Sequence, residues 1–352
     1  MKALTCVKKP FSKQRIERIS MKVSIVIPNC NGASFLGTCL QSLGCQTEKE
    51  FKIIIVDNGS TDNSLQVIEE EKKKLVAAGF EAGNIVLIKN EENLGFCGGV
   101  NAGIVQVDTE YCILLNNDTE VDKDFVKESI RGIEESKKIF SVSPKMIQMY
   151  NKELIDSAGD GYTLLGWGFP FGNDKPVEEY DEKREVFSAC GGAAIYRTTL
   201  LKRLGLFDEN HFAYLEDVDI GYRAKIYGYK NMYNPKAIVY HAGSGFTGSR
   251  HNEFKIGKAA RNNIYLIYKN MPLVQLIINF VFILAGCILK CLYFLKKDKQ
   301  FAKAYMDGVM EGLKTCKKCK KIKYKEKNLK NYIKIEKELI INTFICLKTK
   351  CS

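Results

Sequence analysis

The strongest constraint on the fold is a regular alternation of short apolar segments with segments of helical periodicity. Four apolar runs lie at residues 23–27, 52–56, 84–88 and 111–115, and the stretches between them carry apolar residues at helical spacing. Strands that are apolar on both faces are typical of parallel sheets covered by helices on both sides. We therefore expect an α/β fold with a mostly parallel central sheet.

Beyond residue 120 the pattern becomes less regular. We expect a helix after residue 124, strands at 140–147, 193–196 and 236–241, and helices at 197–204 and 216–227. Between residues 157 and 185 glycines and aromatic residues predominate, which predicts a long loop or hairpin excursion.

The charge of the chain is concentrated at its ends. Residues 296–352 contain seventeen lysines and six acidic residues, and residues 1–21 contain six basic residues and one Glu. The middle of the chain is therefore mildly acidic although the net charge is +12. This distribution argues against a nucleic-acid groove across the body and suits ends that lie near an anionic membrane face.

One segment, residues 273–295, is long and apolar enough to span a bilayer, but Gln275, Asn279 and Lys290 interrupt it. A membrane-surface helix, or a buried helix of the core or of a dimer interface, would also fit. We expect much of the lysine-rich tail that follows to be disordered. The predicted organisation is a basic extension (1–21), a catalytic domain (22–270), an apolar membrane-associated helix (271–295) and a lysine-rich tail (296–352).

The thirteen cysteines are irregularly spaced, and residues 1–21 lack the apolar core of a signal peptide. We therefore expect reduced thiols in a cytoplasmic protein. Cys316 and Cys319 form a single CxxC without a second pair, so a zinc site there is the less favoured alternative.

Polar side chains follow each of the first four predicted strands, at the sheet edge where open α/β folds bind ligands. Asn29 and Asn31 follow the first strand, Asp57 and Asn58 the second, a glycine-rich segment (93–103) the third, and Asn116-Asn117-Asp118 the fourth. Neither GxGxxG nor a Walker A lysine loop is present at the first turn, so a dinucleotide or P-loop site is not expected there. Taken singly, these segments could also be ordinary turns, helix caps or packing loops.

Two further features suggest chemistry. Asp118 could bind Mg²⁺ or Mn²⁺, and His241, one of three histidines, follows the last predicted strand and could complete a site for such a divalent cation. Three carboxylates, Glu216, Asp217 and Asp219, lie within four residues at a predicted helix start. One of them could act as a general base, and the alternative is favourable charge at a helix N-terminus.

Seven segments in this order resemble family 2 glycosyltransferases of the GT-A fold, in particular bacterial rhamnosyltransferases of cell-wall and O-antigen assembly. They are VSIVIPNCNG, IIIVDNGSTD, NEENLGFCGGVNAGI, LLNNDTEV, GGAAIYR, FDENHFAYLEDVDIGYRA and VYHAGSG. The resemblance covers about residues 22–270. It implies the GT-A nucleotide-diphospho-sugar transferase fold. The C-terminal membrane-associated helical segment expected from the apolar residues 273–295 follows this region.

The resemblance also implies roles for individual residues. The base and ribose of a nucleotide-diphosphate sugar donor would be lined by Pro28, Asn29, Asn31, Asp57 and Asn58. The diphosphate and donor sugar would be bordered by Asn93, Gly95, Asn101 and Asn117. Asp118 and His241 would hold the divalent cation, and Asp217 would be the catalytic base, supported by Glu216 and Asp219.

One departure from the family pattern concerns the metal. Asn116 stands where the first acid of the family's DxD motif is expected, so one metal ligand is lost or weakened. The resemblance implies inversion by single displacement. Gly166-Trp167-Gly168-Phe169 could form an acceptor wall, because aromatic side chains stack on sugar faces. For Trp167 the alternative is a packed anchor of the loop.

The expected partners are the donor, a glycan or lipid-linked acceptor and the inner face of the cell membrane, with no nucleic acid. Deoxythymidine-linked rhamnose is the first expectation for the donor, with uridine-linked hexoses open. Two other functions remain as alternatives: a nucleotidyltransferase that makes a sugar nucleotide, and a nonenzymatic protein that binds anionic surfaces. Residues 28–36 carry no Lys or Arg, which counts against the former.

Overall fold

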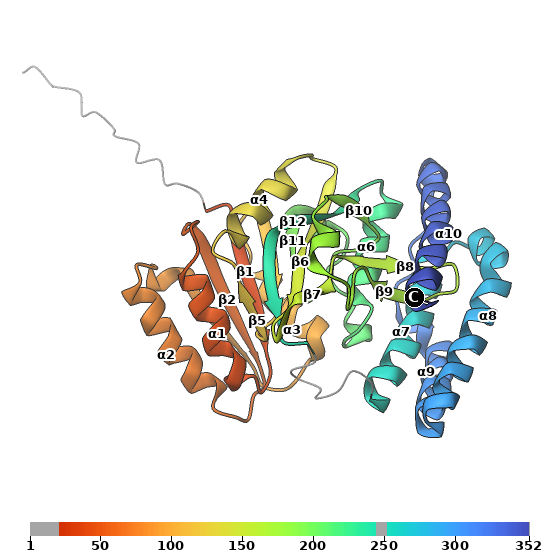
Figure 1. The fold of residues 1–352 in the computed structure, drawn as a ribbon, viewed down its shortest axis with the longest axis horizontal. Coiled ribbons are helices and arrows are strands. Elements are labelled where there is room, and N and C mark those ends of the chain that lie inside the picture. The colour runs from red at the N-terminus through yellow and green to blue at the C-terminus, as the bar shows by residue number, and fades with distance from the viewer. Residues whose placement is uncertain (1–20, 244–251, 352) are drawn as a thin grey trace, which may run out of the picture.

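The computed structural model describes residues 21–243 and 252–351. The basic extension expected at the N-terminus lies, apart from Met21, outside this range. The described chain forms a ten-stranded sheet in the order β10-β12-β6-β11-β4-β1-β2-β3, with β5 added to β12 and β7 added to β6. Helices cover the sheet, and a second block of helices stands at the side of the molecule away from α1 and α2 (Figure 1).

The first four strands form the parallel part of the sheet, as predicted. Their bounds are β1 (Val23–Asn29), β2 (Phe51–Asn58), β3 (Ile85–Asn90) and β4 (Tyr111–Leu115). β1 pairs in parallel with both β2 and β4, and β2 with β3. Their carboxyl ends therefore meet at one edge of the sheet.

The other part of the sheet is mixed. It contains β5 (Thr119–Val121), β6 (Ile139–Gln148), β7 (Asn151–Ser157), β10 (Arg184–Val186), β11 (Ala193–Arg197) and β12 (Lys230–His241). β11 runs antiparallel to both β4 and β6, whereas β12 is parallel to β6. The predicted strand at 236–241 is only the second half of β12, because the strand continues past Pro235 through a register shift between Asn234 and Ile238.

Helices cover both faces of the sheet, as expected. α1 (Ala33–Gly44), α2 (Ser64–Ala77) and α4 (Phe125–Glu134) pack on one face. α3 (Gly95–Val105), α5 (Thr198–Arg203) and α6 (Glu216–Ile226) pack on the other. Strand β1 shows the alternation, because Ile25 and Ile27 face the first layer and Val26 the second.

The glycine- and aromatic-rich excursion contains a small hairpin, as predicted, formed by β8 (Asp160–Tyr162) and β9 (Gly168–Pro170). Short 3₁₀ turns are η1 (Ala82–Asn84), η2 (Val177–Tyr180), η3 (Glu209–His211), η4 (Cys316–Lys318) and η5 (Glu326–Asn328).

The C-terminal region is helical, and the expectation of a largely disordered tail is wrong. It forms α7 (Glu253–Asn270), α8 (Leu273–Lys297), α9 (Lys299–Thr315) and α10 (Leu329–Cys351). In α10 Tyr332, Ile335, Leu339 and Cys346 are buried at helical spacing. This stripe is sufficient to hold a lysine-rich segment against the protein.

Candidate active site

The carboxyl ends of three neighbouring strands are joined by a row of side-chain hydrogen bonds. The amide of Asn117, after β4, donates to Asn29 Oδ1 of β1 over 2.6 Å. Asn29 Nδ2 in turn donates to Asp57 Oδ1 of β2 over 3.0 Å. The structure therefore brings together Asn29, Asp57 and Asn117, with Pro28 immediately before Asn29 in β1. A Cβ on Gly32 would lie 1.9 Å from Asn117 Nδ2, so a side chain there would displace Asn117.

Asn31 holds the first strand-end loop against the second. Its side-chain oxygen accepts from the backbone N–H of Thr61 over 2.8 Å and of Asp62 over 3.3 Å. Asn31 also has φ 52°, a left-handed conformation that asparagine tolerates better than most residues. These contacts fix the rim of the strand-end surface on which Asn29 and Asp57 lie.

The side-chain amides of Asn58 and Asn101 are hydrogen-bonded to other residues of the protein. Asn58 Nδ2 donates to Asn93 Oδ1 and to the carbonyl of Gly95, both over 3.0 Å. Asn101 exchanges hydrogen bonds with the backbone of Phe207, at 2.8 and 3.2 Å. Both asparagines are almost completely buried, so the structure gives them a role in positioning the glycine-rich segment and the loop before α6. Donor contact by these two amides stays a prediction.

Gly95 permits a close approach between that segment and the loop before α6. Its φ of +73° is left-handed, and a Cβ there would lie 2.5 Å from the Phe212 ring. Any other residue at this position would push the two loops apart.

The two expected metal ligands lie side by side. β5 pairs with β12 so that Thr119 is opposite His241, and His241 Nε2 lies 3.4 Å from Asp118 Oδ1. The other ring nitrogen, Nδ1, lies 2.8 Å from Asp156 Oδ2 of β7. Burial lowers the pKa of His241, but hydrogen bonds to Asp118 and Asp156 outweigh this effect and raise it to about 10.

Asp156 was not found from the sequence. A carboxylate on the second ring nitrogen orients a ligating histidine and increases its basicity. The oxygen and nitrogen donors of Asp118 and His241 suit Mg²⁺ or Mn²⁺, and their close approach fits a shared cation.

Glu216 and Asp217 begin α6 after a tightly turned loop. Phe212, Tyr214 and Leu215 have φ of 65°, 75° and 63°, which is costly for residues with a side chain. Asp217 then accepts two backbone hydrogen bonds, from Gly191 N–H over 2.9 Å and from Val218 N–H over 2.7 Å. The carboxylate is thereby fixed at the helix N-terminus.

A third carboxylate, Asp160 of β8, completes this group and was also missed. One ligand atom each of Asp160, Cys190 and Asp217 lies within 4.8 Å of the others. Burial and the charges of Asp217, Asp156 and Glu216 raise the pKa of Asp160 well above its usual value. Asp160 therefore lies beside the base candidate Asp217, and the charge of Asp156, the partner of His241, also acts on its carboxyl group.

The carboxylates differ in how strongly they hold a proton. Burial, followed by the charge of Asp217, raises the pKa of Glu216 well above its usual value. Burial also raises the pKa of Asp217, but hydrogen bonds from backbone N–H groups, that of Gly191 first, oppose the rise. Backbone hydrogen bonds oppose the rise at Glu216 too, but there the charge of Asp217 is a larger cause and adds to the rise. Asp217 is the carboxylate for which backbone hydrogen bonds are the main effect after burial, and they favour the ionised form that a general base requires.

Asp219 takes no part in this group. It lies about 200° around the helix from Asp217, and contacts Arg223 Nη2 at 2.8 Å and Lys269 Nζ at 2.9 Å. Its pKa is lowered because the attraction of these two cations outweighs burial. Asp219 therefore attaches α6 to α7 rather than supporting the base.

The turned loop before α6 is held from α7 by a fully buried side chain, Asn262. Its amide donates to the carbonyls of His211, Ala213 and Tyr214 over 2.9, 2.7 and 2.8 Å. Arg261 Nη2 donates to the His211 carbonyl over 2.8 Å. Sequence reasoning gave no role to either residue.

Trp167 is the packed anchor that the sequence left as an alternative. It is 9% exposed, and its Nε1 donates to the carbonyl of Gly286 in α8 over 3.2 Å. The expected acceptor wall is therefore not formed by this indole.

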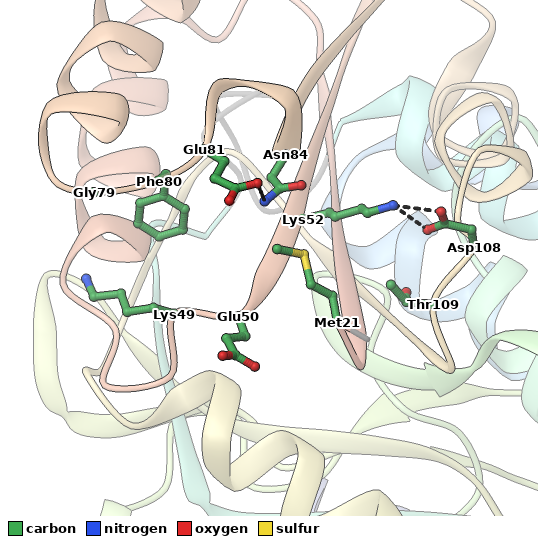
Figure 2. A pocket seen from close by; sticks show the side chains of 10 residues that line it. All are labelled: Met21, Lys49, Glu50, Lys52, Gly79, Phe80, Glu81, Asn84, Asp108 and Thr109. Atoms are coloured by element: carbon green, nitrogen blue, oxygen red, sulfur yellow. Dashed lines mark hydrogen bonds and ion pairs between the residues drawn. The ribbon is translucent and has the colours of Figure 1, made fainter. Parts of the chain in front are cut away.

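A separate cavity of about 950 Å³ opens at the other edge of the sheet, where the parallel strands begin. Figure 2 shows Lys52 of β2 reaching Asp108, a contact of 2.7 Å, with Met21 and Phe80 nearby. This cavity lies at the opposite ends of the strands from the site built above.

The mixed sheet with acidic groups and amides at its strand ends is the GT-A fold of glycosyltransferases. A family model described as glycosyl transferase family 2 matches residues 24–205, and the chain belongs to that family. Enzymes of this family invert the configuration at the anomeric carbon of the sugar that they transfer. Membership of the family excludes the two alternative functions, a nucleotidyltransferase and a nonenzymatic binding protein.

Curated relatives include the amylovoran biosynthesis glycosyltransferase AmsB of Erwinia amylovora, 28% identical over 65% of this chain and 72% of that protein. The N-acetylglucosaminyl-diphospho-decaprenol L-rhamnosyltransferase of Mycobacterium tuberculosis is 26% identical over 59% of this chain and 72% of that protein. The poly(ribitol-phosphate) beta-N-acetylglucosaminyltransferase TarS of Staphylococcus aureus is 29% identical over 56% of this chain, but the match spans only 31% of TarS.

Solved structures share the fold. A TarS fragment (1–349) in complex with UDP-GlcNAc has a TM-score of 0.55 and 20% identity over 85% of this chain and 84% of that one. The mannosyltransferase PcManGT of Pyrobaculum calidifontis, in complex with GDP-Man and Mn²⁺, has a TM-score of 0.54 and 13% identity over 87% and 91%.

Proposed function

We propose that this enzyme transfers a sugar from a nucleotide-diphosphate sugar to a glycan or lipid-linked acceptor in the synthesis of a cell-surface polysaccharide. The observation that carries the proposal is the position of Asp160. It lies beside the Asp217 carboxylate, and the charge of Asp156, which contacts His241, also raises the pKa of Asp160, which supports treating the base and metal candidates as parts of one site. The curated relatives that act on amylovoran, a decaprenol-linked sugar and poly(ribitol phosphate) support this class of acceptor.

The donor is proposed to lie across the strand ends. Pro28, Asn29, Asn31 and Asp57 border its base and ribose, and Asn93, Gly95 and Asn117 its diphosphate and sugar. Asn58 and Asn101 hold the glycine-rich segment and the loop before α6 in place, and contact of their amides with the donor stays a prediction. Deoxythymidine-linked rhamnose is the first candidate donor, and uridine-linked sugars are the alternative.

Asp118 and His241 would hold Mg²⁺ or Mn²⁺. A cation bound there would offset negative charge on the diphosphate. Asp156 orients the His241 ring for this task.

The proposed reaction is a single displacement. The acceptor hydroxyl oxygen bonds to the anomeric carbon while the bond from that carbon to the diphosphate oxygen breaks. Asp217 takes the hydroxyl proton, and the nucleoside diphosphate leaves with the electron pair. Backbone hydrogen bonds from Gly191 and Val218 hold Asp217 in place before the acceptor arrives. No protein nucleophile is needed.

The test is a donor screen that follows nucleoside diphosphate release with and without Mn²⁺. Wild-type enzyme should respond to one donor class. Asp217→Asn, which keeps the shape of the side chain, should lower kcat about 10²- to 10⁴-fold. Full activity of this variant with every accepted donor would refute the role of Asp217.

We also propose that the enzyme works at the inner face of the cell membrane. Among the described residues one helix, α8, is long and apolar enough to cross a bilayer.

A further inference from the structure

Helix α8 has two different faces. Its buried residues Gln275, Asn279, Ile283 and Gly286 lie on one side of the helix. At about 100° per residue, Lys290 also falls on that side. All three polar residues that interrupt the apolar sequence are therefore turned toward the protein.

The opposite face of α8 is apolar along the whole helix. Val274, Ile277, Val281, Leu284, Ile288, Leu292 and Leu295 lie on it, each between 49% and 69% exposed. With 25 residues the helix is about 37 Å long. An apolar exposed stripe of this length is unusual for a surface bathed only in water.

The inner face of α8 is attached to the catalytic domain. A Cβ on Gly286 would lie 2.2 Å from the carbonyl oxygen of Leu165, so the helix backbone touches the β8–β9 hairpin directly. Gln275 and Asn279 both donate to Glu336 of α10, over 2.8 and 3.0 Å.

After α8 the chain returns to the same catalytic domain. Asn342 of α10 donates to the carbonyl of Tyr162 over 3.1 Å, and the N–H of Leu164 donates to Thr343 over 2.9 Å. Lys225 of α6 pairs with Glu338 at 2.9 Å. If α8 crossed a bilayer, the parts of the chain before and after it would lie on opposite sides and these contacts could not form.

Helix α10 extends the apolar surface. Leu273, Val274 and Ile278 of α8 line one groove with Leu329 and Ile333 of α10. Further along α10, Ile340, Ile341, Phe344 and Leu347 are exposed. Exposed lysines lie at the end of α8 (Lys296 and Lys297), at the start of α9 (Lys299) and along α10 (Lys330, Lys334 and Lys337).

We infer that the outer faces of α8 and α10 form a docking surface for an anionic lipid bilayer, on which the protein lies without crossing it. The apolar stripe enters the acyl boundary and the lysines contact anionic headgroups, the arrangement of an interfacial helix. This inference adds a binding surface to the membrane location proposed above. It rests on the proposed function in one respect, namely that the surface gives the enzyme access to a lipid-linked acceptor.

The test uses the full-length purified protein and preformed vesicles of phosphatidylcholine, with or without phosphatidylglycerol, in a flotation assay. A folded docking surface should bind preformed vesicles, with about fivefold gain in partition for each lysine that meets an anionic surface. The gain should decline as salt is added. No binding to vesicles of either composition would overturn the inference.

The variant Ile277→Glu/Val281→Glu places two charges on the exposed stripe, and each substitution should reduce vesicle partition at least about tenfold. The matched control is Val76→Glu on α2, where Val76 is 40% exposed and far from the docking surface in sequence. It should bind like wild type. Light scattering after size exclusion tests whether a second copy of the protein covers this face instead of a bilayer. If wild type forms a dimer that the double variant does not form, and wild type does not bind vesicles, the face is a dimer interface and the inference is wrong.

Catalysis is followed separately. Without lipid, nucleoside diphosphate release from the donor should be the same in the double variant as in wild type. Loss of vesicle binding with normal release would be the expected result, whereas absence of release in wild type would count against the proposed reaction alone.

Discussion

Asn262 offers the sharpest test of how the base is positioned. Its amide donates to the carbonyls of Ala213 and Tyr214 in the loop where Phe212, Tyr214 and Leu215 have left-handed φ. Asn262→Ala would leave these two carbonyls without that donor, at about 1–3 kcal/mol each. Allowing for relaxation of the loop, we expect the free energy of unfolding to fall by roughly 2–4 kcal/mol.

The same substitution should reduce catalysis more than donor binding. Strain at left-handed residues costs about 1–3 kcal/mol each, so the released loop will relax and displace Asp217. A displacement of about 1 Å can cost 10²-fold in rate. We therefore expect kcat to fall about 100-fold, with a small change in the KM for the donor.

The assays are urea denaturation and initial-rate kinetics at a temperature where both proteins are folded. The control is Asn331→Ala, which removes one hydrogen bond that the side-chain amide donates to the Ile226 carbonyl over 3.0 Å, outside the site. It should cost about 1 kcal/mol and leave kcat unchanged. A normal kcat in Asn262→Ala, whatever its stability, would refute the positioning argument.

Two other predictions concern the metal site and pH. Asp156→Asn should raise the Mn²⁺ concentration for half-maximal activity about 10- to 100-fold; an unchanged Mn²⁺ titration would contradict the orienting role given to Asp156. Burial lowers the pKa of His211 to about 4, from 6.5 in the unfolded chain, so the unfolded state takes up a proton first and stability falls as pH falls. Between pH 7 and pH 5 this histidine should lower the free energy of unfolding by about 2 kcal/mol. The measurement compares how the free energy of unfolding depends on pH in wild type and in His211→Phe; the same pH dependence in both proteins would contradict the prediction.

The parallel part of the fold could be predicted because each of its strands can be recognised from a short stretch of consecutive residues. Each of the first four strands is an apolar run closed by polar residues, and each run is long enough to be recognised alone. The mixed part was harder, because Pro235 resembles a strand break although β12 continues through a register shift. The helices of the tail were missed because lysines outnumber the few apolar residues that hold α10 in place.

The sequence resemblance named Asp118 and His241 together as metal ligands, and the pairing of β5 with β12 places them side by side. The residues that contact the metal and base candidates were not predicted. Asp156 acts from 85 positions away in sequence from His241, and no local pattern marks it. Asn262 likewise acts on carbonyls 48 to 51 positions away, so its role depends on how α7 packs.

The β8–β9 hairpin joins the carboxylates to the C-terminal helices within a few residues. Asp160 borders Asp217 at one end, while Tyr162, Leu164 and Trp167 are bound by α10 and α8 at the other. Shortening the protein before α8 to obtain an easily handled fragment would remove the partners of this hairpin along with the apolar surface. Such a fragment would lack the contacts that hold the hairpin beside Asp217, so its kcat would not represent that of the intact enzyme.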